Sequence, residues 1–253
     1  MNLRFIKYLL LIIIISTSYF CKAQVLGEDY SQEVLRKEWN AYGMLRSLGW
    51  GAGYRTGKQI TIFKKYFLET ELNFVKHDKE VKGKNINFPF SKDFVYGKLS
   101  RMNVLRIGYG EQQTLNFKPY WGGTEVRFNY FGGFSLALTS PIYLTIYREN
   151  VNENKYNVSV EKYNPEIHNL NNIYGNGPLG KGWFEFSAYP GFYLKTSLSF
   201  EFGSNERKVR SLEVGALLDA YPIPIKIMAF NQPQNFFYAF YLSLHFGVRK
   251  DYY

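Results

Sequence analysis

The chain has 253 residues, of which 31 are Lys or Arg and 21 are Asp or Glu, giving a formal net charge of +10 at pH 7. It is 46% hydrophobic and 21% charged, which excludes a disordered or low-complexity protein. Aromatic residues make up 19% of the chain and 22 residues are Gly, a combination typical of β-rich proteins because Phe and Tyr favour strands and Gly favours turns.

The segment 1–23 has the layout of a secretory signal peptide. A basic start precedes the apolar run 8–15, which is far too short to span a membrane as a helix. The small residues Cys21 and Ala23 fit the positions before a cleavage site after residue 23. The alternative is a lipoprotein cysteine at Cys21, but Phe20 is larger than the residue such sites accept there. Cleavage would leave 28 basic and 21 acidic residues, a net charge of +7.

The cysteine and histidine content argues against metal chemistry. Cys21 is the only cysteine, so the mature chain would have neither disulfides nor thiolate metal sites. The three histidines, His77, His168 and His245, show no metal-ligand spacing, and we expect no metal and no cofactor. Because the basic residues are scattered along an exported chain, we expect either contact with anionic lipid or simple solvation of these charges, and no contact with nucleic acid.

The mature chain divides into a short leader and one large domain. The segment 24–41 is predicted to be periplasmic and to contain a short helix over 30–39. The remainder, 42–253, is predicted to form a single β-barrel. Its hydrophobicity alternates with a period of two, which is the pattern of strands that have one apolar face.

Eight strands are predicted from this alternation. The first covers 42–54, with Arg46 interrupting its apolar face, and a turn at 56–58 leads into the second. The third, 94–109, changes the parity of its apolar residues after Val104, as a β-bulge would cause. A turn at 139–141 is expected between the fourth and fifth strands. Strands two and four to eight cover 60–74, 126–138, 142–146, 192–202, 212–220 and 236–248.

The connections support an outer-membrane topology. From a periplasmic N-terminus, 139–141 and 203–207 fall on the periplasmic side as short turns, and 150–182 falls outside as the longest loop. Short periplasmic turns and longer external loops are the bacterial outer-membrane pattern. Because successive connections alternate between the two sides of the membrane, the long connection 77–93 is placed on the periplasmic side and the short one at 56–58 outside. These two connections fit the pattern poorly.

Three features favour a membrane barrel with an apolar exterior over a soluble one with an apolar core. Most strands exceed the ~5–6 residues usual in globular proteins and reach the ~9–11 needed to cross a bilayer. Acids, bases and glycines on the opposite face suit a narrow, filled interior. Aromatic residues gather at the strand ends, as in interfacial girdles: Tyr42, Tyr54, Tyr66, Phe74, Tyr130, Tyr189, Phe236 and Tyr238.

The predicted fold class is therefore all-β, an eight-stranded antiparallel transmembrane β-barrel. The alternatives are ten strands or a soluble lipocalin-like barrel. Charges in such an interior must pair across neighbouring strands, and eight strands leave no room for an open pore. The predicted interior charge network consists of Glu69, Glu71, Glu125, Arg127, Lys195, Glu201, Glu213, Asp219 and Arg249.

The chain resembles the small outer-membrane β-barrel proteins of the Bacteroidota. The resemblance is carried by Ala23-Gln24 at the end of the signal, by the aromatic-Gly-aromatic strands and by the aromatic-rich final strand 236–248. It implies a location in the cell outer membrane, with outer-membrane lipid and another envelope protein as partners. Such families include secretion-system accessory barrels, adhesins and lipid-modifying enzymes, among which fold alone does not choose.

Two functions are considered. We expect a non-enzymatic anchor, scaffold or accessory subunit of an envelope assembly or secretion machine. The alternative is an outer-membrane lipid hydrolase, because Ser243, His245 and Asp219 share the non-apolar face and a Ser-His-acid set can hydrolyse an ester. Small lipid A deacylase barrels carry His before Ser, whereas here Ser comes first, and a pair facing the interior does not open toward lipid.

The connection 221–235 is unusually apolar for a loop. One interpretation is that it folds back to cap the barrel mouth or dips into lipid headgroups. The other is a docking surface for a partner, since rigid, Met-containing apolar segments suit such contacts. The residues of this possible docking loop are Ile223, Ile225, Ile227, Met228 and Phe230.

Overall fold

The structure of the chain is a computed structural model that describes residues 36–85, 90–117, 123–150, 155–178, 180–203 and 207–251. Thirteen strands lie in these ranges. The described part of the chain contains no helix long and apolar enough to cross a bilayer. The predicted signal peptide, 1–23, and most of the predicted helix, 30–35, lie outside the described residues.

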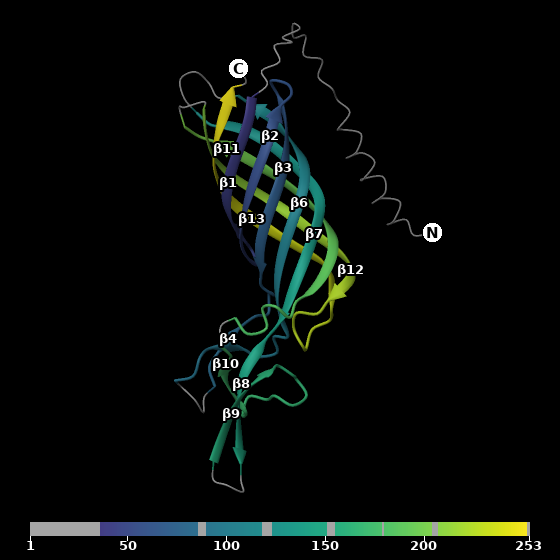
Figure 1. The fold of residues 1–253 in the computed structure, drawn as a ribbon. Coiled ribbons are helices and arrows are strands. Elements are labelled where there is room, and N and C mark those ends of the chain that lie inside the picture. The colour runs from purple at the N-terminus through teal and green to yellow at the C-terminus, as the bar shows by residue number, and fades with distance from the viewer. Residues whose placement is uncertain are drawn as a thin grey trace, which may run out of the picture. The chain divides into compact units, whose positions relative to one another are not determined.

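Eight strands close into an antiparallel barrel, which confirms the predicted all-β class and strand number (Figure 1). Each strand pairs with its predecessor in the barrel, and the first pairs with the last, with Arg36 opposite Asp251. The ten-stranded alternative is therefore wrong. The barrel strands are β1 (Arg36–Arg46), β2 (Gly49–Gln59), β3 (Lys64–Val75), β6 (Ser100–Asn116), β7 (Glu125–Pro141), β11 (Ser187–Glu201), β12 (Lys208–Ile225) and β13 (Gln234–Asp251).

The barrel has an apolar exterior and a polar interior. On β13, Phe236, Tyr238 and Phe240 are 64–75% exposed, whereas Ala239 and Tyr241, which have the opposite parity, are each 3% exposed. The same alternation, apolar outward and polar or small inward, runs along β3, β11 and β12. A soluble lipocalin-like barrel would have the opposite arrangement, so that alternative does not describe this chain.

Aromatic rings gather in neighbouring pairs toward the two ends of the exterior. Near the end where Arg36 pairs with Asp251, the rings of Tyr66 and Tyr109 stack with centroids 5.4 Å apart. Toward the opposite end, Trp50 and Phe74 stack at 4.4 Å. Tyr42 and Tyr189 are exceptions to the predicted girdle. The side chain of Tyr42 is buried inside the barrel, and Tyr189 packs against the interior apolar cluster at the opposite end.

The two ends of the barrel differ in the length of their connections. We call the end with Arg36 and Asp251 the terminal end and the opposite end the loop end. The terminal-end connections are 60–63, 117–124 and 202–207; at the loop end, 47–48 is short, and 76–99, 142–186 and 226–233 are longer. The prediction that 77–93 lies on the same side as the termini is therefore wrong.

That error comes from an unrecognised hairpin. The expected single strand 42–54 is two strands, β1 and β2, joined by a turn at 47–48. The inward residues are even-numbered on β1 and odd-numbered on β2, so Met44 faces the interior and Trp50 the exterior. Gly49 makes the turn possible: its φ is +127°, and a Cβ there would lie 1.9 Å from the carbonyl oxygen of Phe74.

Two neighbouring boundaries change with this hairpin. The segment 36–39, expected to be helical, begins β1, in which the alternate residues Glu38, Asn40 and Tyr42 are buried inside the barrel. The expected turn at 56–58 lies within β2, and the chain reverses at 60–63 instead. Period-two alternation over only a few residues was too weak to fix either boundary.

The third predicted strand also differs. Phe94 belongs to the short strand β5 (Phe94–Val95), paired with β4 (Lys82–Gly83), and the barrel strand β6 starts at Ser100. No bulge occurs at 104–105, since β6 keeps its register with β3 there and shifts against β7 only between Thr114 and Asn116. The parity change arises because Val104 points into an apolar part of the interior.

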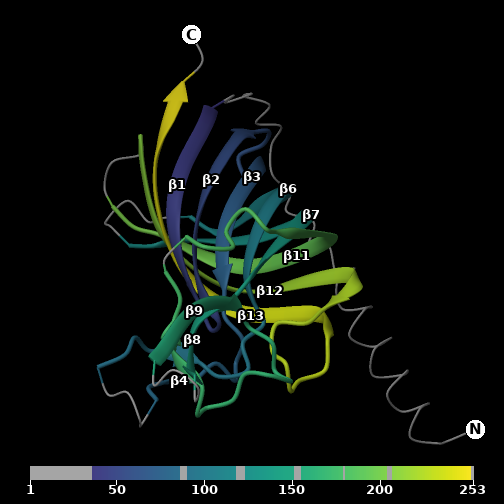
Figure 2. The ribbon, with the colours of Figure 1, turned by 60° about the horizontal axis from the view of Figure 1, so that its bottom comes forward.

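The predicted turn at 139–141 and fifth barrel strand are wrong. β7 continues to Pro141, and the next strand, β8 (Tyr143–Asn150), leaves the barrel. β8 forms a separate three-stranded sheet with β9 (Lys155–Lys162) and β10 (Ile173–Asn176) beyond the loop end, which we call the loop-end sheet (Figure 2). Leu144, Ile146 and Ile173 of this sheet form a second core together with Phe94, Ile142 and Tyr163.

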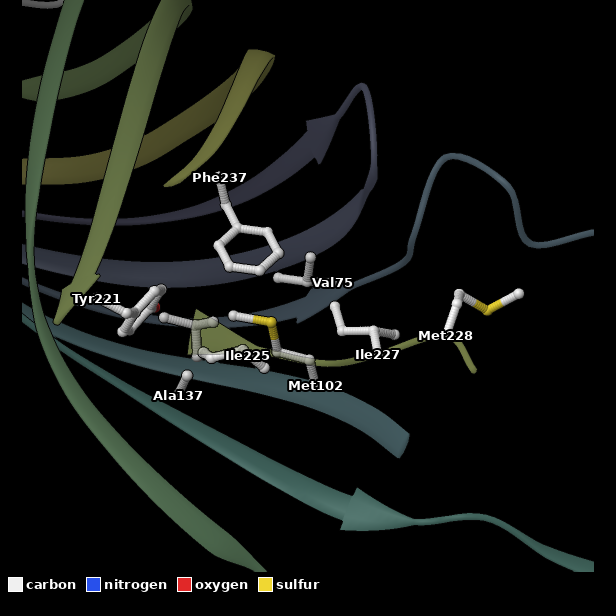
Figure 3. Packing of buried hydrophobic residues seen from close by; sticks show 9 residues of the cluster. Val75, Met102, Ala137, Tyr221, Ile225, Ile227, Met228 and Phe237 are labelled. Carbon is white, nitrogen blue, oxygen red and sulfur yellow. The ribbon is translucent and has the colours of Figure 1, made fainter. Parts of the chain in front are cut away.

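The apolar segment 221–235, whose first residues to Ile225 belong to β12, closes the loop end of the barrel interior. Ile225, Ile227 and Met228 are 2–7% exposed and pack with Met102 and Phe237 (Figure 3). We call this cluster the apolar plug; its other members are Val75, Val104, Ala137 and Tyr221. Because these three side chains are buried, they present no surface to a partner, and the segment covers the loop end of the interior. Ile223 and Phe230 of the same segment are exposed.

Truncating one methyl group of the plug tests this assignment. Ile225→Val is expected to lower the free energy of unfolding by about 0.5–1.5 kcal/mol, because it removes buried contacts from a close-packed site. Ile223→Val, an identical change at a side chain that is exposed in the same strand, is the control and should change it by less than about 0.5 kcal/mol. Equal effects in urea titrations of the folded barrel would contradict the plug.

Candidate functional site

Among the described residues, seven basic and seven acidic side chains face the barrel interior, so their formal charges cancel. A buried charge without a partner is strongly unfavourable, so this balance is what a filled interior requires. The side chains form two groups along the barrel. The basic residues are Arg46, Arg55, Lys65, Arg106, Arg127, Lys195 and Arg249, and the acidic residues are Glu38, Glu69, Glu71, Glu125, Glu201, Glu213 and Asp219.

The first group lies toward the terminal end. Glu38 of β1 accepts hydrogen bonds from Lys65 Nζ at 2.7 Å and from Arg249 Nε at 2.8 Å. Arg127 of β7 lies 2.6 Å from Glu201 and donates to Glu125 at 2.8 Å. Arg249 also donates to Glu201, which joins the two halves of the group. Residues from five strands are thereby linked across the barrel.

The second group, the central cluster, is built around Arg106. Its guanidinium donates to both oxygens of Asp219, at 2.8 and 2.7 Å, and to Glu71 at 2.9 Å. Arg106 and Asp219 are both fully buried. Two-point contact between a guanidinium and a carboxylate fixes orientation as well as charge, so β6 and β12 are held in one arrangement across the interior.

Arg55 and Lys195 complete the central cluster. Arg55 of β2 donates to both oxygens of Glu213, at 2.7 and 2.9 Å, and also to Glu69. Lys195 of β11 donates to Glu69 at 3.1 Å and to Glu71. The carboxylates of Glu69 and Glu71 therefore each lie between two cations, which compensates for their proximity to each other.

Aromatic side chains pack around these charges. Arg55 lies over the rings of Phe131, at 4.4 Å, and Tyr42, at 4.9 Å, distances at which a cation is attracted to a ring face. The hydroxyl of Tyr42 donates to Glu71 at 2.6 Å. Tyr193 is accommodated by Gly108, where a Cβ would lie 2.2 Å from the tyrosine oxygen. The central interior is therefore occupied by protein side chains.

All nine residues of the predicted charge network lie on the interior face, and eight of them pair with an acid or base on a different strand. Glu125 is the exception, since its partner Arg127 lies on the same strand. Sequence reasoning missed five further members. Glu38 fell in the predicted helix, and Arg46 and Arg55 lie on the two strands of the unrecognised hairpin. Arg106 lies where the parity on β6 was ambiguous. Lys65 has the same parity as Glu69 and Glu71 on β3, and this parity was the signal that could have identified it.

The structure brings Ser243 and His245 together but not Asp219. Ser243 Oγ lies 2.9 Å from His245 Nε2, and His245 Nδ1 lies 3.1 Å from Oδ1 of Asn40. Asp219 binds Arg106 instead. Ser243 and His245 are 1% and 2% exposed, and the ring of Tyr42 covers His245 at 4.3 Å. The pair has hydrolase-like distances, but a substrate has no access to it.

At the loop end, Lys98 contacts both the connection after β3, through Glu80, and the apolar plug, through Met228. Its ammonium lies 2.6 Å from a carboxylate oxygen of Glu80, and burial lowers the pKa of Lys98. Its backbone forms an isolated β-bridge with Met228 of the plug. The described residues contain no group of three or more His, Cys, Asp or Glu side chains arranged to hold a metal ion.

No protein-family model matches this sequence, and no curated protein matches it. Among solved structures, the chain is similar to Neisserial surface protein A (NspA), with a TM-score of 0.37, 10% identity, and coverage of 86% of this chain and 97% of that one. It is similar to the N-terminal β-barrel domain of Pseudomonas aeruginosa OprF, with a TM-score of 0.34, 12% identity, and coverage of 85% and 97%.

A third similar structure is Ail, the attachment invasion locus protein of Yersinia pestis, with a TM-score of 0.36, 6% identity, and coverage of 85% of this chain and 96% of that one. At identities of 6–12%, these similarities concern the fold alone.

Proposed function

We propose that this protein is a non-enzymatic anchor in a bacterial outer membrane, of the kind that the Bacteroidota resemblance implies, which holds the loop-end sheet outside the cell. The observation that carries the proposal is a closed barrel with an apolar exterior, a filled interior and a separately folded sheet at the end with the longer connections. Such a barrel can serve as an attachment point for another envelope protein, in an assembly or secretion machine.

The exterior supports the membrane location. Large apolar side chains such as Leu194, Phe240 and Leu244 are 46–71% exposed on strands of 15–18 residues, which is more than a bilayer crossing needs. Exposing such an apolar band is unfavourable in water and favourable in lipid. Closure of the barrel leaves no open sheet edge at mid-strand, as a hydrocarbon environment requires.

The interior supports an anchor over a channel. The apolar plug closes the loop end, and the central cluster and its aromatic neighbours occupy the middle.

In planar bilayers we therefore expect the purified protein to give no ion conductance at voltages at which a water-filled porin of known conductance gives clear steps. Stable, reproducible openings would contradict the filled interior.

Topology is tested by labelling single cysteines on intact cells. The mature chain lacks cysteine once the signal is removed, so each introduced thiol is unique. Val158→Cys, on the exposed side of β9, should react with a membrane-impermeant maleimide on whole cells. Thr61→Cys, in the exposed turn at the terminal end, is the matched control and should react only after the envelope is permeabilised. The reverse pattern would overturn the orientation.

Membrane insertion itself is tested by fractionation. The mature protein should be recovered from outer membranes only with detergent and should migrate as a heat-modifiable band. Recovery in a soluble periplasmic fraction would reject the proposal.

The lipid hydrolase remains the second candidate because of the contact between Ser243 and His245 at 2.9 Å. Its burial argues against this function. Lipid A mass spectra from cells that carry the parent or Ser243→Ala should show the same acylation. A change in acyl-chain number with the parent alone would favour the hydrolase.

A further inference from the structure

At the loop end, the β1–β2 hairpin is shorter than the neighbouring strand β13. β1 ends at Arg46, which pairs with Tyr241, whereas β13 begins at Gln234. The segment 234–240 of β13 pairs with β12 on one edge, and no described strand pairs with its other edge. At about 3.4 Å per residue, this overhang extends roughly 20 Å along the strand beyond the β1–β2 turn. The result is a notch above that turn, between β13 and the end of β3.

A cavity of about 300 Å³ lies in this notch. Phe236, Tyr238 and Phe240, which face outward on β13, form one wall, and the turn residues Ser47 and Leu48 lie below. The chain that leaves β3 at Lys76 forms the other side, fixed by a hydrogen bond from Lys76 N to the Leu48 carbonyl at 3.1 Å. The volume is at the lower end of the range for small-molecule sites and is small for an added polypeptide strand.

One wall of the notch is apolar and the opposite side is positively charged. Its aromatic wall continues the apolar exterior of the barrel, so it favours a hydrocarbon chain. Its opposite side carries the exposed ammonium of Lys76, which makes no ion pair among the described residues. The neighbouring acid, Asp78, contacts His77 at 2.6 Å. The open edge of the overhang also presents backbone hydrogen-bonding groups, which need polar partners where a membrane excludes water.

We propose that the notch binds an anionic membrane lipid. Its negatively charged headgroup lies against Lys76 and the open edge of β13, and one of its acyl chains lies along Phe236, Tyr238 and Phe240. A lipid satisfies both halves of the site at once, which neither a free anion nor an uncharged chain does. This inference rests on the proposed membrane location and names a ligand for the barrel's outer rim.

The proposal is tested by native mass spectrometry of the detergent-solubilised mature protein. The protein is equilibrated with equal amounts of dioleoyl phosphatidylglycerol and dioleoyl phosphatidylcholine. The parent should retain one phosphatidylglycerol in at least fivefold preference to phosphatidylcholine. Lys76→Ala should reduce retention of phosphatidylglycerol about five- to tenfold, because one charge-assisted contact is lost, and should leave phosphatidylcholine unchanged. Ser47→Trp, which fills the notch, should reduce retention of both lipids.

Two variants at the loop end but away from the notch are matched controls. Lys226→Ala and Ser187→Trp change exposed residues in the same way and should behave as the parent does. Inorganic phosphate at millimolar concentration should not displace the lipid; full displacement would show a free-phosphate site and overturn the lipid assignment. So would parent-like retention in both Lys76→Ala and Ser47→Trp.

Heat-modifiability, measured on every sample, separates the two proposals. A heat-modifiable parent that shows no lipid preference rejects the notch and leaves the anchor intact. A parent that is not heat-modifiable rejects the membrane location on which both depend. If Ser47→Trp fails to fold, Lys76→Ala alone decides the lipid proposal.

Discussion

Replacing Arg106 with Met is expected to lower the free energy of unfolding by about 3–5 kcal/mol, the largest effect of any single substitution considered for this barrel. Met keeps most of the side-chain volume but removes the guanidinium that binds Asp219 and Glu71. Both carboxylates are fully buried and would lose a charge partner without gaining water. The quantity to measure is the midpoint and slope of urea unfolding in detergent, followed by the fraction of heat-modifiable protein.

A control variant and a double variant show whether the loss of stability comes from the buried charges. Arg210→Met removes an exposed arginine from β12 and should change the free energy of unfolding by less than about 0.5 kcal/mol. Removing Arg106 leaves one excess negative charge among the interior side chains. Adding Asp219→Asn to Arg106→Met removes that excess and should recover part of the stability. A cost below about 1 kcal/mol for Arg106→Met would mean that water reaches the central cluster, and the filled interior would be wrong.

Replacing Val214 with Arg is expected to lower the free energy of unfolding in a bilayer by about 2–4 kcal/mol, because it places a charge in the hydrocarbon layer. Val214 is 46% exposed and pairs with Leu198 on β11 and Leu242 on β13, which are both outward and apolar. Leu198→Arg should have a similar effect. The measurement is the yield and stability of heat-modifiable protein after folding into vesicles.

The control for the lipid-facing change is Thr56→Arg, at an exposed outward position toward the terminal end of β2. There a long basic side chain reaches the interface, and the effect should be about 0–1 kcal/mol. Arg at Ser197, which faces the interior and is 4% exposed, should act through crowding, because the space around it is filled. If Val214→Arg assembled as well as the parent, the exterior of the barrel would not face lipid.

The sequence predicted several features of the barrel from residue alternation. The inward or outward direction of side chains on β11, β12 and β13 follows from parity, because successive side chains of a strand point to opposite faces. The nine predicted interior charges could be named for the same reason. Pairing was expected because an unpaired interior charge is unfavourable, but the sequence did not show which acid meets which base.

The errors cluster where alternation is short or interrupted. The β1–β2 hairpin was missed because a two-residue turn changes the parity of the inward residues without adding a polar stretch. As a result, Tyr42 and Met44 were both assigned to the exterior, although both face the interior. Ile142, Leu144 and Ile146 alternate like a barrel strand, yet they form the core of the loop-end sheet. Eight was the right number of strands because one missed strand and one misplaced strand offset each other.

By itself, the sequence determined the all-β class, which depends on the local period of two. It also determined the apolar exterior, which follows from the strand lengths and from the charges on the opposite face. The tertiary structure alone decided the partners of Arg106, the plug formed by Ile225 and Ile227, and the notch beside the β13 overhang. Those features join residues far apart in the chain, and their geometry depends on strand register and on the unequal heights of neighbouring hairpins. No local pattern of residues encodes either quantity, because both arise only when the barrel closes.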